Sequence, residues 1–95
     1  LVAHAGMKPN IAAEEQEDAW LLWYRYHPNQ MAHLYKHFYH GHTPFVGRIE
    51  MAADRTNVDS GCVYGGNLAA AIVGDNGQPE GFVLVPSKKP DLNLF

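Results

Sequence analysis

An Asn-Gly pair between two apolar runs is the feature that most constrains the fold of this chain. The run NLAAAIV, which follows a glycine pair, precedes Asn76 and Gly77, and the run GFVLV comes after them. Asparagine and glycine both tolerate the positive φ angles of a tight hairpin turn, so the two runs are predicted to be antiparallel strands. The first of them is predicted to be buried. The C-terminal third of the chain is therefore expected to be β-structure.

The first half of the chain is predicted to be helical. In residues 11–27, four acidic side chains precede a group of aromatic residues at helical spacing, and Pro28 follows. Acidic residues near the start of a helix interact favourably with its dipole, and proline ends a helix. The spacing places Trp20 and Trp23 on the face expected to be buried. A second, shorter helix is expected over residues 29–38.

Short strands are predicted between the helices and the hairpin. Residues 36–41 are rich in aromatic side chains and end at a glycine, and residues 47–61 suggest two strands joined near Ala53 and Asp54. This order of elements indicates one mixed domain of the α/β (α+β) class, with helix first and sheet later. Residues 87–95 form a polar tail that a proline interrupts.

Composition limits the partners that the chain can have. Its 95 residues suffice for one small domain. A net charge of −3 gives no basic surface for a nucleic acid, and no apolar run approaches the ~20 residues that cross a membrane. The single cysteine, Cys62, cannot form an internal disulfide. That usage fits a reducing compartment, so a cytoplasmic location is expected.

The start of the chain is typical of the end of a buried strand. The apolar residues 1–3 are followed at once by His4, an alanine and a glycine. Domains seldom begin inside a buried strand. We therefore expect that residue 1 is not the natural start and that further sequence precedes it.

Six histidines are the main candidates for chemistry, because neutral imidazole is the commonest protein metal ligand. Four of them lie within ten residues: His33, His37, His40 and His42. His33 and His37 stand four apart and would share one helix face, a spacing that suits zinc. No glutamate follows His33 to complete a metalloprotease motif, and histidines in such a helix are commonly surface residues. A local zinc site is therefore one alternative.

The second candidate site is distributed along the chain. His4, His42 and Asp59 each follow a predicted strand, with glycine close by in all three cases. Loops at strand ends commonly carry the ligand-binding groups of α/β proteins, and glycine lets the backbone pass close to an ion or a substrate. The three polar side chains are therefore expected to converge on one edge of a sheet.

Four motifs in order add to this hypothesis: VAHAG at residues 2–6, LLWYR at 21–25, HGHTPF at 40–45 and NVDSGCVYGGNLAA at 57–70. Together they resemble the C-terminal half of the calcineurin-like metallophosphoesterases, most closely the bacterial and bacteriophage-lambda-type serine/threonine protein phosphatases. The resemblance covers residues 1 to about 75. It implies the C-terminal half of a β-sandwich flanked by helices, so residues 1–95 would form a partial phosphoesterase domain.

The resemblance also implies a role for each candidate residue. His4 and His42 would bind one ion of a pair of divalent metals, with manganese expected and iron or zinc as alternatives. Arg25 would bind the substrate phosphate, because a guanidinium matches phosphate oxygens in a bidentate way that lysine cannot. Asp59 would orient a ligand or the water near the metals. The implied activity is hydrolysis of a phosphoester in a phosphoprotein or a nucleotide.

The N-terminal motifs of that family are absent from these 95 residues. Asp-x-His, Gly-Asp-x-x-Asp-Arg-Gly and Gly-Asn-His-Glu would supply the first metal's ligands, the bridging aspartate and the acid histidine. The catalytic residues are therefore expected upstream of residue 1, in the missing half of the fold, and the chain alone is expected to be inactive. Two other functions stay open: hydrolysis of dinucleoside polyphosphates such as diadenosine tetraphosphate, and a non-catalytic module with the local histidine site.

Overall fold

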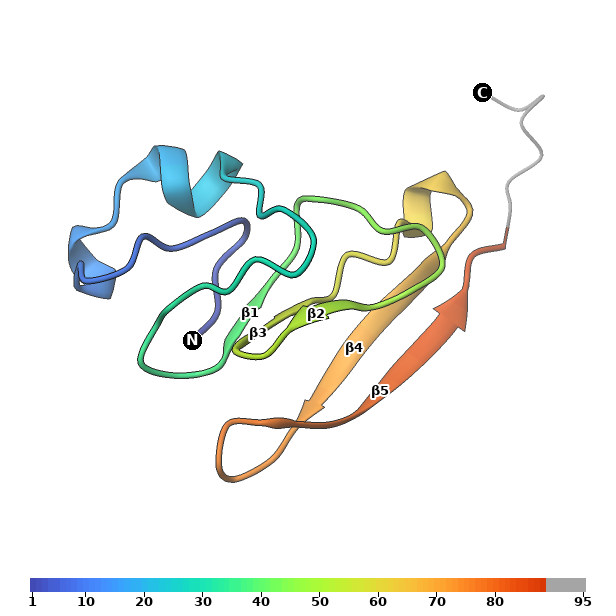
Figure 1. Cartoon of the computed structure of the whole chain (residues 1–95). Helices are drawn as coiled ribbons and strands as arrows, with labels where there is room; N and C mark the ends of the chain where they lie inside the picture. The colour runs from blue at the N-terminus through green and yellow to red at the C-terminus, as the bar shows by residue number, and fades with distance from the viewer. Residues whose placement is uncertain (89–95) are drawn as a thin grey trace.

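A computed structural model describes residues 1–88, and most of the predicted polar tail lies outside the described residues. The described part is a small mixed α/β fold with two sheets and three short helical turns (Figure 1). The first sheet has the order β1-β3-β2, formed by Phe38–His40, Arg55–Asn57 and Glu50–Ala52. The second sheet pairs β4 (Asn67–Val73) with β5 (Pro79–Pro86). The turns are η1 (Ala13–Glu15), η2 (Ala19–Trp23) and η3 (Cys62–Tyr64).

The first sheet contains the parallel pairing on which the candidate site depends. β1 runs parallel to β3, and β2 pairs antiparallel with β3 on its other side. Residues 1–4 extend the sheet along the free edge of β1: the Tyr39 N–H donates to the Leu1 carbonyl (2.9 Å), and Val2 bridges Tyr39 in parallel. The chain start is therefore extended, as predicted, although Val2 is exposed rather than buried. Residues 1–4, β1 and β3 run in one direction and end at the same edge.

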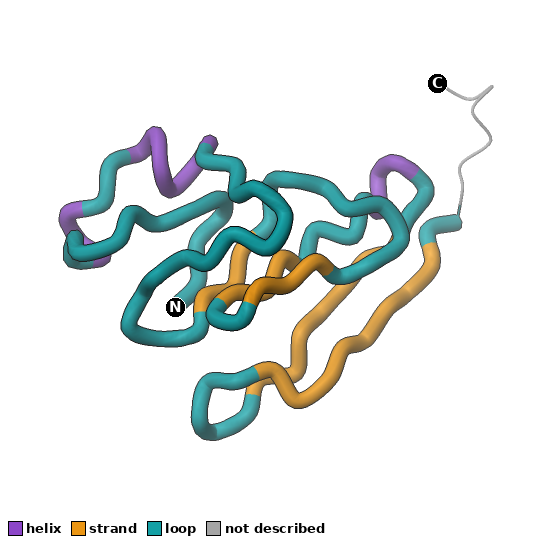
Figure 2. The backbone as a smooth tube through the Cα atoms, viewed as in Figure 1, coloured by secondary structure: helices purple, strands orange, loops and turns teal. Residues whose placement is uncertain are grey.

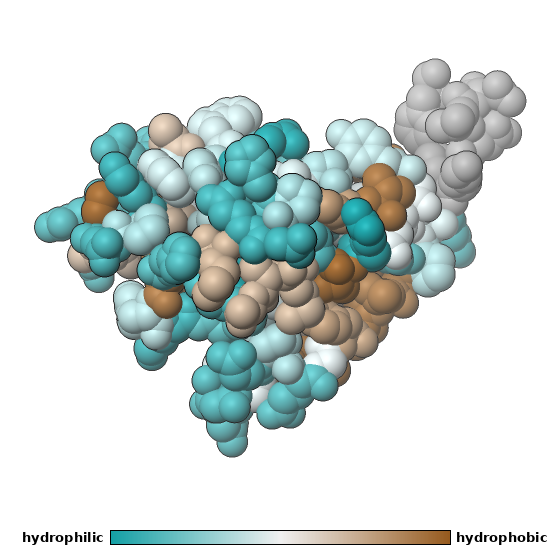
Figure 3. Space-filling model, viewed as in Figure 1, coloured by the Kyte–Doolittle hydropathy of each residue, from teal (hydrophilic) through white to brown (hydrophobic). Residues whose placement is uncertain are grey.

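The C-terminal hairpin forms as predicted. Gly77 has the positive φ of 80° that the turn requires, and Leu68 pairs with Val85 across the two strands. The Tyr39 hydroxyl donates to the Gly77 carbonyl (2.9 Å), which ties the turn to β1. The expectation that β4 is buried is wrong, because the ribbon forms a sheet of its own and side chains such as Leu68 and Ile72 stay exposed. Figure 3 shows apolar side chains gathered over this hairpin.

The helix predicted over residues 11–27 is not present. Only η1 and η2 form there, with extended backbone at Gln16 between them, and loops dominate the chain before β1 (Figure 2). The Gln16 side-chain amide both donates to and accepts from the backbone of Lys8, which holds the chain out of helical geometry. Like charges four residues apart in the acidic run, such as Glu14 and Asp18, also repel each other in a helix.

The second predicted helix, over residues 29–38, is also wrong. The Asp54 carboxylate accepts hydrogen bonds from the backbone N–H groups of Ala32 (2.9 Å) and His33 (2.7 Å). These contacts replace helical bonds, and His33 has a positive φ of 57° that a right-handed helix cannot contain. A long-range contact thus overrides the local helical pattern. No helix within residues 1–88 has the length and apolar character needed to cross a bilayer.

A buried arginine organises the middle of the fold. Arg55, in β3, is fully buried, and its guanidinium forms a bidentate pair with Glu50 in β2 (2.6 and 2.9 Å). Its other N–H groups donate to the carbonyls of Gln30 (2.6 Å) and His27 (3.1 Å). The last donor meets Nε2 of His40 at 3.2 Å. All five guanidinium donors therefore have partners.

The apolar core packs against this charged network. Its buried members are Met7, Tyr26, Ala32 and Phe38. The Tyr26 ring lies 4.8 Å from the guanidinium carbon of Arg55, and the Tyr26 hydroxyl donates to the Met7 carbonyl (3.2 Å). Because the core is small, the arginine contributes a large share of the contacts that place the loops around the sheet.

Removal of the Glu50 carboxylate should destabilise the fold strongly. Glu50→Ala leaves the buried Arg55 charge without its anion, and breaking a buried ion pair from one side costs about 3–5 kcal/mol. Urea denaturation followed by circular dichroism measures the free energy of unfolding, with Glu14→Ala, at an exposed position, as the control. A Glu50→Ala protein within about 0.5 kcal/mol of that control would contradict the role given to Arg55.

Candidate functional site

The ends of three parallel segments bring His4, His42 and Asp59 to one edge of the first sheet. His4 closes the extended chain start, His42 lies two residues after β1, and Asp59 lies two residues after β3. The Gly41 N–H donates to the His4 carbonyl (2.8 Å), so backbone pairing holds the first two ends together. Neighbouring parallel strands end at the same edge of a sheet, which is why residues far apart in the sequence meet here.

The two imidazoles face each other. His4 Nε2 lies 3.1 Å from His42 Nδ1, and the ring planes meet at 59°. Two nitrogens that bind the same ion at about 2.0–2.1 Å stand about 2.8–3.4 Å apart at octahedral or tetrahedral angles. The observed distance therefore fits a shared ion as well as a direct hydrogen bond between the rings. Imidazole pairs suit zinc, iron and other transition metals, so the donors present fit a divalent ion.

Asp59 flanks the pair without joining it. A Cβ atom placed on Gly41 would lie 3.5 Å from the Asp59 Cβ and 3.8 Å from the His4 carbonyl oxygen. One oxygen of the Asp59 carboxylate accepts the Gly61 N–H (3.2 Å). Within residues 1–88, no group of three or more histidine, cysteine, aspartate or glutamate side chains gathers to hold an ion. The described residues thus offer two imidazole ligands.

His42 has an unusual backbone conformation. Its φ of 74° lies in the left-handed region, which costs a histidine about 1–2 kcal/mol. Such a residue persists only where its surroundings fix it. The buried Asn57 side chain supplies one such constraint: its Nδ2 donates to the Thr43 carbonyl (2.7 Å), and its Oδ1 accepts the Asp59 N–H (2.9 Å). Asn57 therefore holds the His42 loop and the Asp59 loop together.

The charges around His42 favour its neutral form. Burial lowers the pKa of His42, and the Arg25 guanidinium and the His4 ring lower it further. The Asp59 carboxylate and a backbone hydrogen bond with Trp23 act in the opposite direction and raise this pKa. Neutral imidazole is the form that binds metals. The charges of Arg25 and Asp59 thus act on His42 in opposite directions.

Arg25 lies in a loop rather than at a helix end. It follows η2 by two residues, after extended backbone at Tyr24, and it is exposed. Within the described residues it has no ion pair. Its guanidinium donors are therefore open to an anion.

Trp23 lies beside the histidine pair and not in the core. Its indole meets the His42 ring edge to face, with centroids 5.7 Å apart, and its side chain is 68% exposed. The expectation of a buried Trp23 is wrong because η2 is a single turn and its face differs from that of the predicted helix. Trp20 is partly buried and stacks on Tyr24 at 3.8 Å.

The local zinc site is not formed by the described residues. His33 is exposed in a loop, and His37 Nε2 lies 2.7 Å from the Thr56 hydroxyl. His40 is buried, and that burial lowers its pKa to about 4. A neutral His40 accepts from Arg55 at Nε2 and donates from Nδ1 to the Gly41 carbonyl (3.2 Å). His37 and His40 therefore support the sheet.

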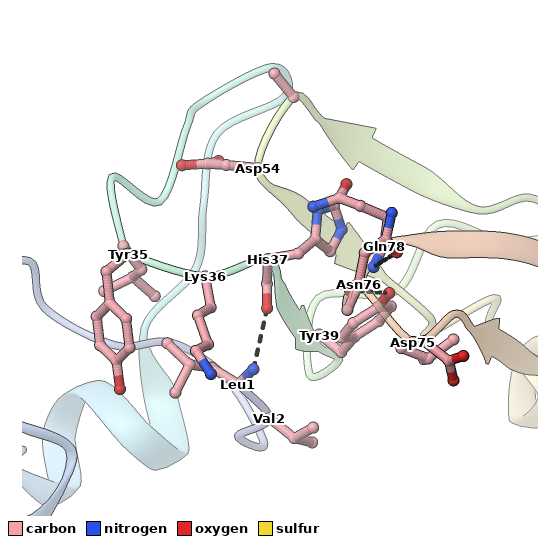
Figure 4. Close-up of a pocket in the computed structure, with 14 residues that line it drawn as sticks. Leu1, Val2, Tyr35, Lys36, His37, Tyr39, Asp54, Asp75, Asn76 and Gln78 are labelled. Atoms are coloured by element: carbon pink, nitrogen blue, oxygen red, sulfur yellow. Dashed lines mark hydrogen bonds between the residues drawn. The ribbon is translucent and has the colours of Figure 1, made fainter.

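A cavity of about 600 Å³ lies at the other end of the same strands (Figure 4). Its walls come from the chain start, the loop before β1 and the hairpin turn, and include His37, Asp54 and Gln78. His37 Nδ1 is buried and unpartnered in the described structure. The four candidate residues line none of this cavity, so it is separate from the histidine pair.

Two important positions were not identified from the sequence. Arg55 and Asn57 hold the loops of the site in place, yet neither was singled out. A signal was present, because the polar run Arg55-Thr56-Asn57 fills a strand and all three residues are buried. Polar side chains in a central strand indicate buried hydrogen-bonding partners.

No protein-family model, no curated protein and no solved structure matches the chain. Function is therefore inferred from the site and from the four motifs. The candidate residues offer two things: imidazole nitrogens as ligands for a cation, and the positive charge of Arg25 for an anion.

Asn57→Ala should loosen the two site loops. It leaves the partly buried Thr43 carbonyl and Asp59 N–H without partners, and the full cost for a buried group is about 1–3 kcal/mol. Amide hydrogen exchange measures the effect directly, and the Asp59 amide should exchange faster than in the unaltered chain.

Asn76→Ala is the matched control for this variant. Asn76 also accepts the N–H two residues further on (3.0 Å), but it lies in the exposed hairpin turn. Its replacement should leave Asp59 exchange unchanged. Equal protection of Asp59 in both variants would show that Asn57 does not hold the site.

Proposed function

We propose that this chain contributes part of the active site of a metal-dependent phosphoester hydrolase of the protein-phosphatase type. The observation that carries the proposal is the approach of His4 Nε2 to His42 Nδ1, at 3.1 Å, across two strand ends. Arg25 supports it, because this cation lies close enough to act on the same histidine. The order of the four motifs points to the same class of enzyme.

In this proposal each residue has one task. His4 and His42 hold a divalent ion, and manganese, iron and zinc all accept imidazole. When bound, the ions acidify water and neutralise charge on the phosphoryl oxygens. Arg25 binds the equatorial oxygens of the phosphate and stabilises the charge that develops there. Asp59 acts through its neighbours, by fixing its loop and by its charge beside His42.

The proposed domain is one part of a larger fold, the C-terminal half of a metallophosphoesterase sandwich. Two imidazoles do not complete a catalytic metal site, so carboxylate ligands and the acid for the leaving group would come from upstream sequence. The exposed apolar side chains of the β4–β5 ribbon support this proposal. A two-stranded ribbon is marginally stable alone in water, and a large apolar patch marks a contact surface.

The substrate in this proposal is a phosphorylated protein or a nucleotide, and the location is cytoplasmic. The net charge of −3 places no broad basic surface on the chain. Recognition of the substrate would therefore depend on the local cations of the site rather than on long-range attraction.

Manganese binding to the chain tests the proposal. In the ¹⁵N-labelled protein with phosphate present, Mn²⁺ should broaden the signals around His4 and His42 selectively. His42→Asn should weaken Mn²⁺ binding by at least about tenfold, since even residues that only support a metal ligand change affinity by that factor.

The control is His33→Asn, which is matched in backbone geometry. His33 and His42 both have positive φ, 57° and 74°, and asparagine tolerates this region, so neither variant adds strain. His33→Asn should leave Mn²⁺ binding unchanged. The same Mn²⁺ affinity in both variants, or Mn²⁺ broadening of signals away from His4 and His42, would contradict the proposal.

A further inference from the structure

The open indole of Trp23 is a feature that the proposed function does not use. Tryptophan is on average one of the more buried residues, yet 68% of this side chain is accessible. Single exposed aromatic residues are common on protein surfaces and need no explanation by themselves. The position of Trp23 is different because its ring packs against His42, a candidate metal ligand, with the ring centroids 5.7 Å apart.

One contact places Trp23 relative to the site. Its ring packs edge to face on His42, with an angle of 86° between the planes. An edge-to-face contact leaves at least one face of the indole uncovered. Within the described residues Trp23 has no second aromatic partner. The uncovered face is therefore held beside the place where His4, His42 and Arg25 would hold a phosphate.

We propose that Trp23 stacks on an aromatic group of the substrate, so that the site selects phosphomonoesters whose ester carries an aromatic ring. The inference rests on the proposed function, because the histidine pair and Arg25 must first place the phosphate. Aromatic pairs prefer centroid separations of about 4.5–7 Å. The Trp23 centroid lies 5.7 Å from that of His42, which places the indole next to a proposed ligand of the ion that would bind the phosphate.

The chemistry separates an aromatic ligand from one that is only apolar. Any apolar group of similar size binds more tightly when its surface is removed from water by packing on the indole. Only an aromatic ring adds the quadrupole interaction of stacked or edge-to-face rings, which strengthens binding by about twofold to tenfold beyond area burial. A comparison of two ligands that match in size and differ in aromaticity therefore isolates the role of Trp23.

The experiment measures ligand affinity by NMR titration of the 95-residue chain with Zn²⁺ present, and needs no turnover. The probes are phenyl phosphate, cyclohexyl phosphate and inorganic phosphate. The unaltered chain should prefer phenyl over cyclohexyl phosphate by about twofold to tenfold. Trp23→Leu should abolish this preference, measured as the ratio of the phenyl and cyclohexyl phosphate affinities within one variant, whereas Trp23→Phe should restore most of it.

Tyr35→Leu is the control for loss of an exposed aromatic residue. Tyr35 is 77% exposed and lines the cavity at the opposite end of the strands, so its replacement should keep the phenyl preference. A second pair of probes, adenosine 5′-monophosphate and ribose 5-phosphate, distinguishes a nucleobase from an aryl ring on the ester oxygen. A Trp23-dependent phenyl preference, or a preference for adenosine 5′-monophosphate that Trp23→Leu abolishes and Trp23→Phe restores, supports the proposal and names the source of the ring.

The titration results distinguish a wrong role for Trp23 from a wrong proposed function. Binding of inorganic phosphate without an aromatic preference in either pair would overturn the role of Trp23 and leave the phosphate site intact. A preference that survives in Trp23→Leu would also overturn it. Failure of every phosphate probe to bind the unaltered chain would overturn the proposed function, and the stacking role with it.

Discussion

The buried Arg55 guanidinium joins the segments that carry the candidate site. It binds Glu50 on the edge strand β2, the His27 carbonyl just after the loop of Arg25, and His40 at the end of β1. Arg55 itself stands on β3, which leads to Asp59. A buried charge is tolerated only when its donors are satisfied, because each unmet bond leaves a desolvated group. All the donors of the Arg55 guanidinium therefore have partners only when these segments are in place together.

The site consists of residues at the ends of extended segments, and its chemistry follows from that position. Backbone pairing sets the distance between His4 and His42, since the Gly41 N–H binds the His4 carbonyl directly. Asn57 then fixes the loops after β1 and β3 through two hydrogen bonds of one buried side chain. A pair of facing imidazoles results, with the Trp23 indole against His42 and with Arg25 acting on the same histidine through its charge. In the proposed function, these residues bind a cation, a phosphate and an aromatic ring attached to the phosphate.

Sequence patterns predicted the β-structure and the approach of His4 to His42 well, and the helices poorly. The hairpin around Gly77 and the turn near Asp54 depend on local backbone preferences, which are visible in the sequence. The helices over residues 11–27 and 29–38 fail because Gln16 and Asp54 bind backbone groups outside their own segments. Such long-range bonds have no local signature. The convergence of His4 and His42 was predictable because parallel strands align their ends whatever the loops between them do.

The central claim is that His4 and His42 form one cation site at the ends of two parallel segments. Crystals of the chain grown with Mn²⁺ and phosphate, with anomalous diffraction recorded at the manganese edge, test it most directly. The account predicts an anomalous peak about 2.0–2.2 Å from both His4 Nε2 and His42 Nδ1, with phosphate density between the ion and Arg25. An anomalous peak bound elsewhere, or two imidazoles that stay joined to each other while Mn²⁺ is present in excess, would contradict it.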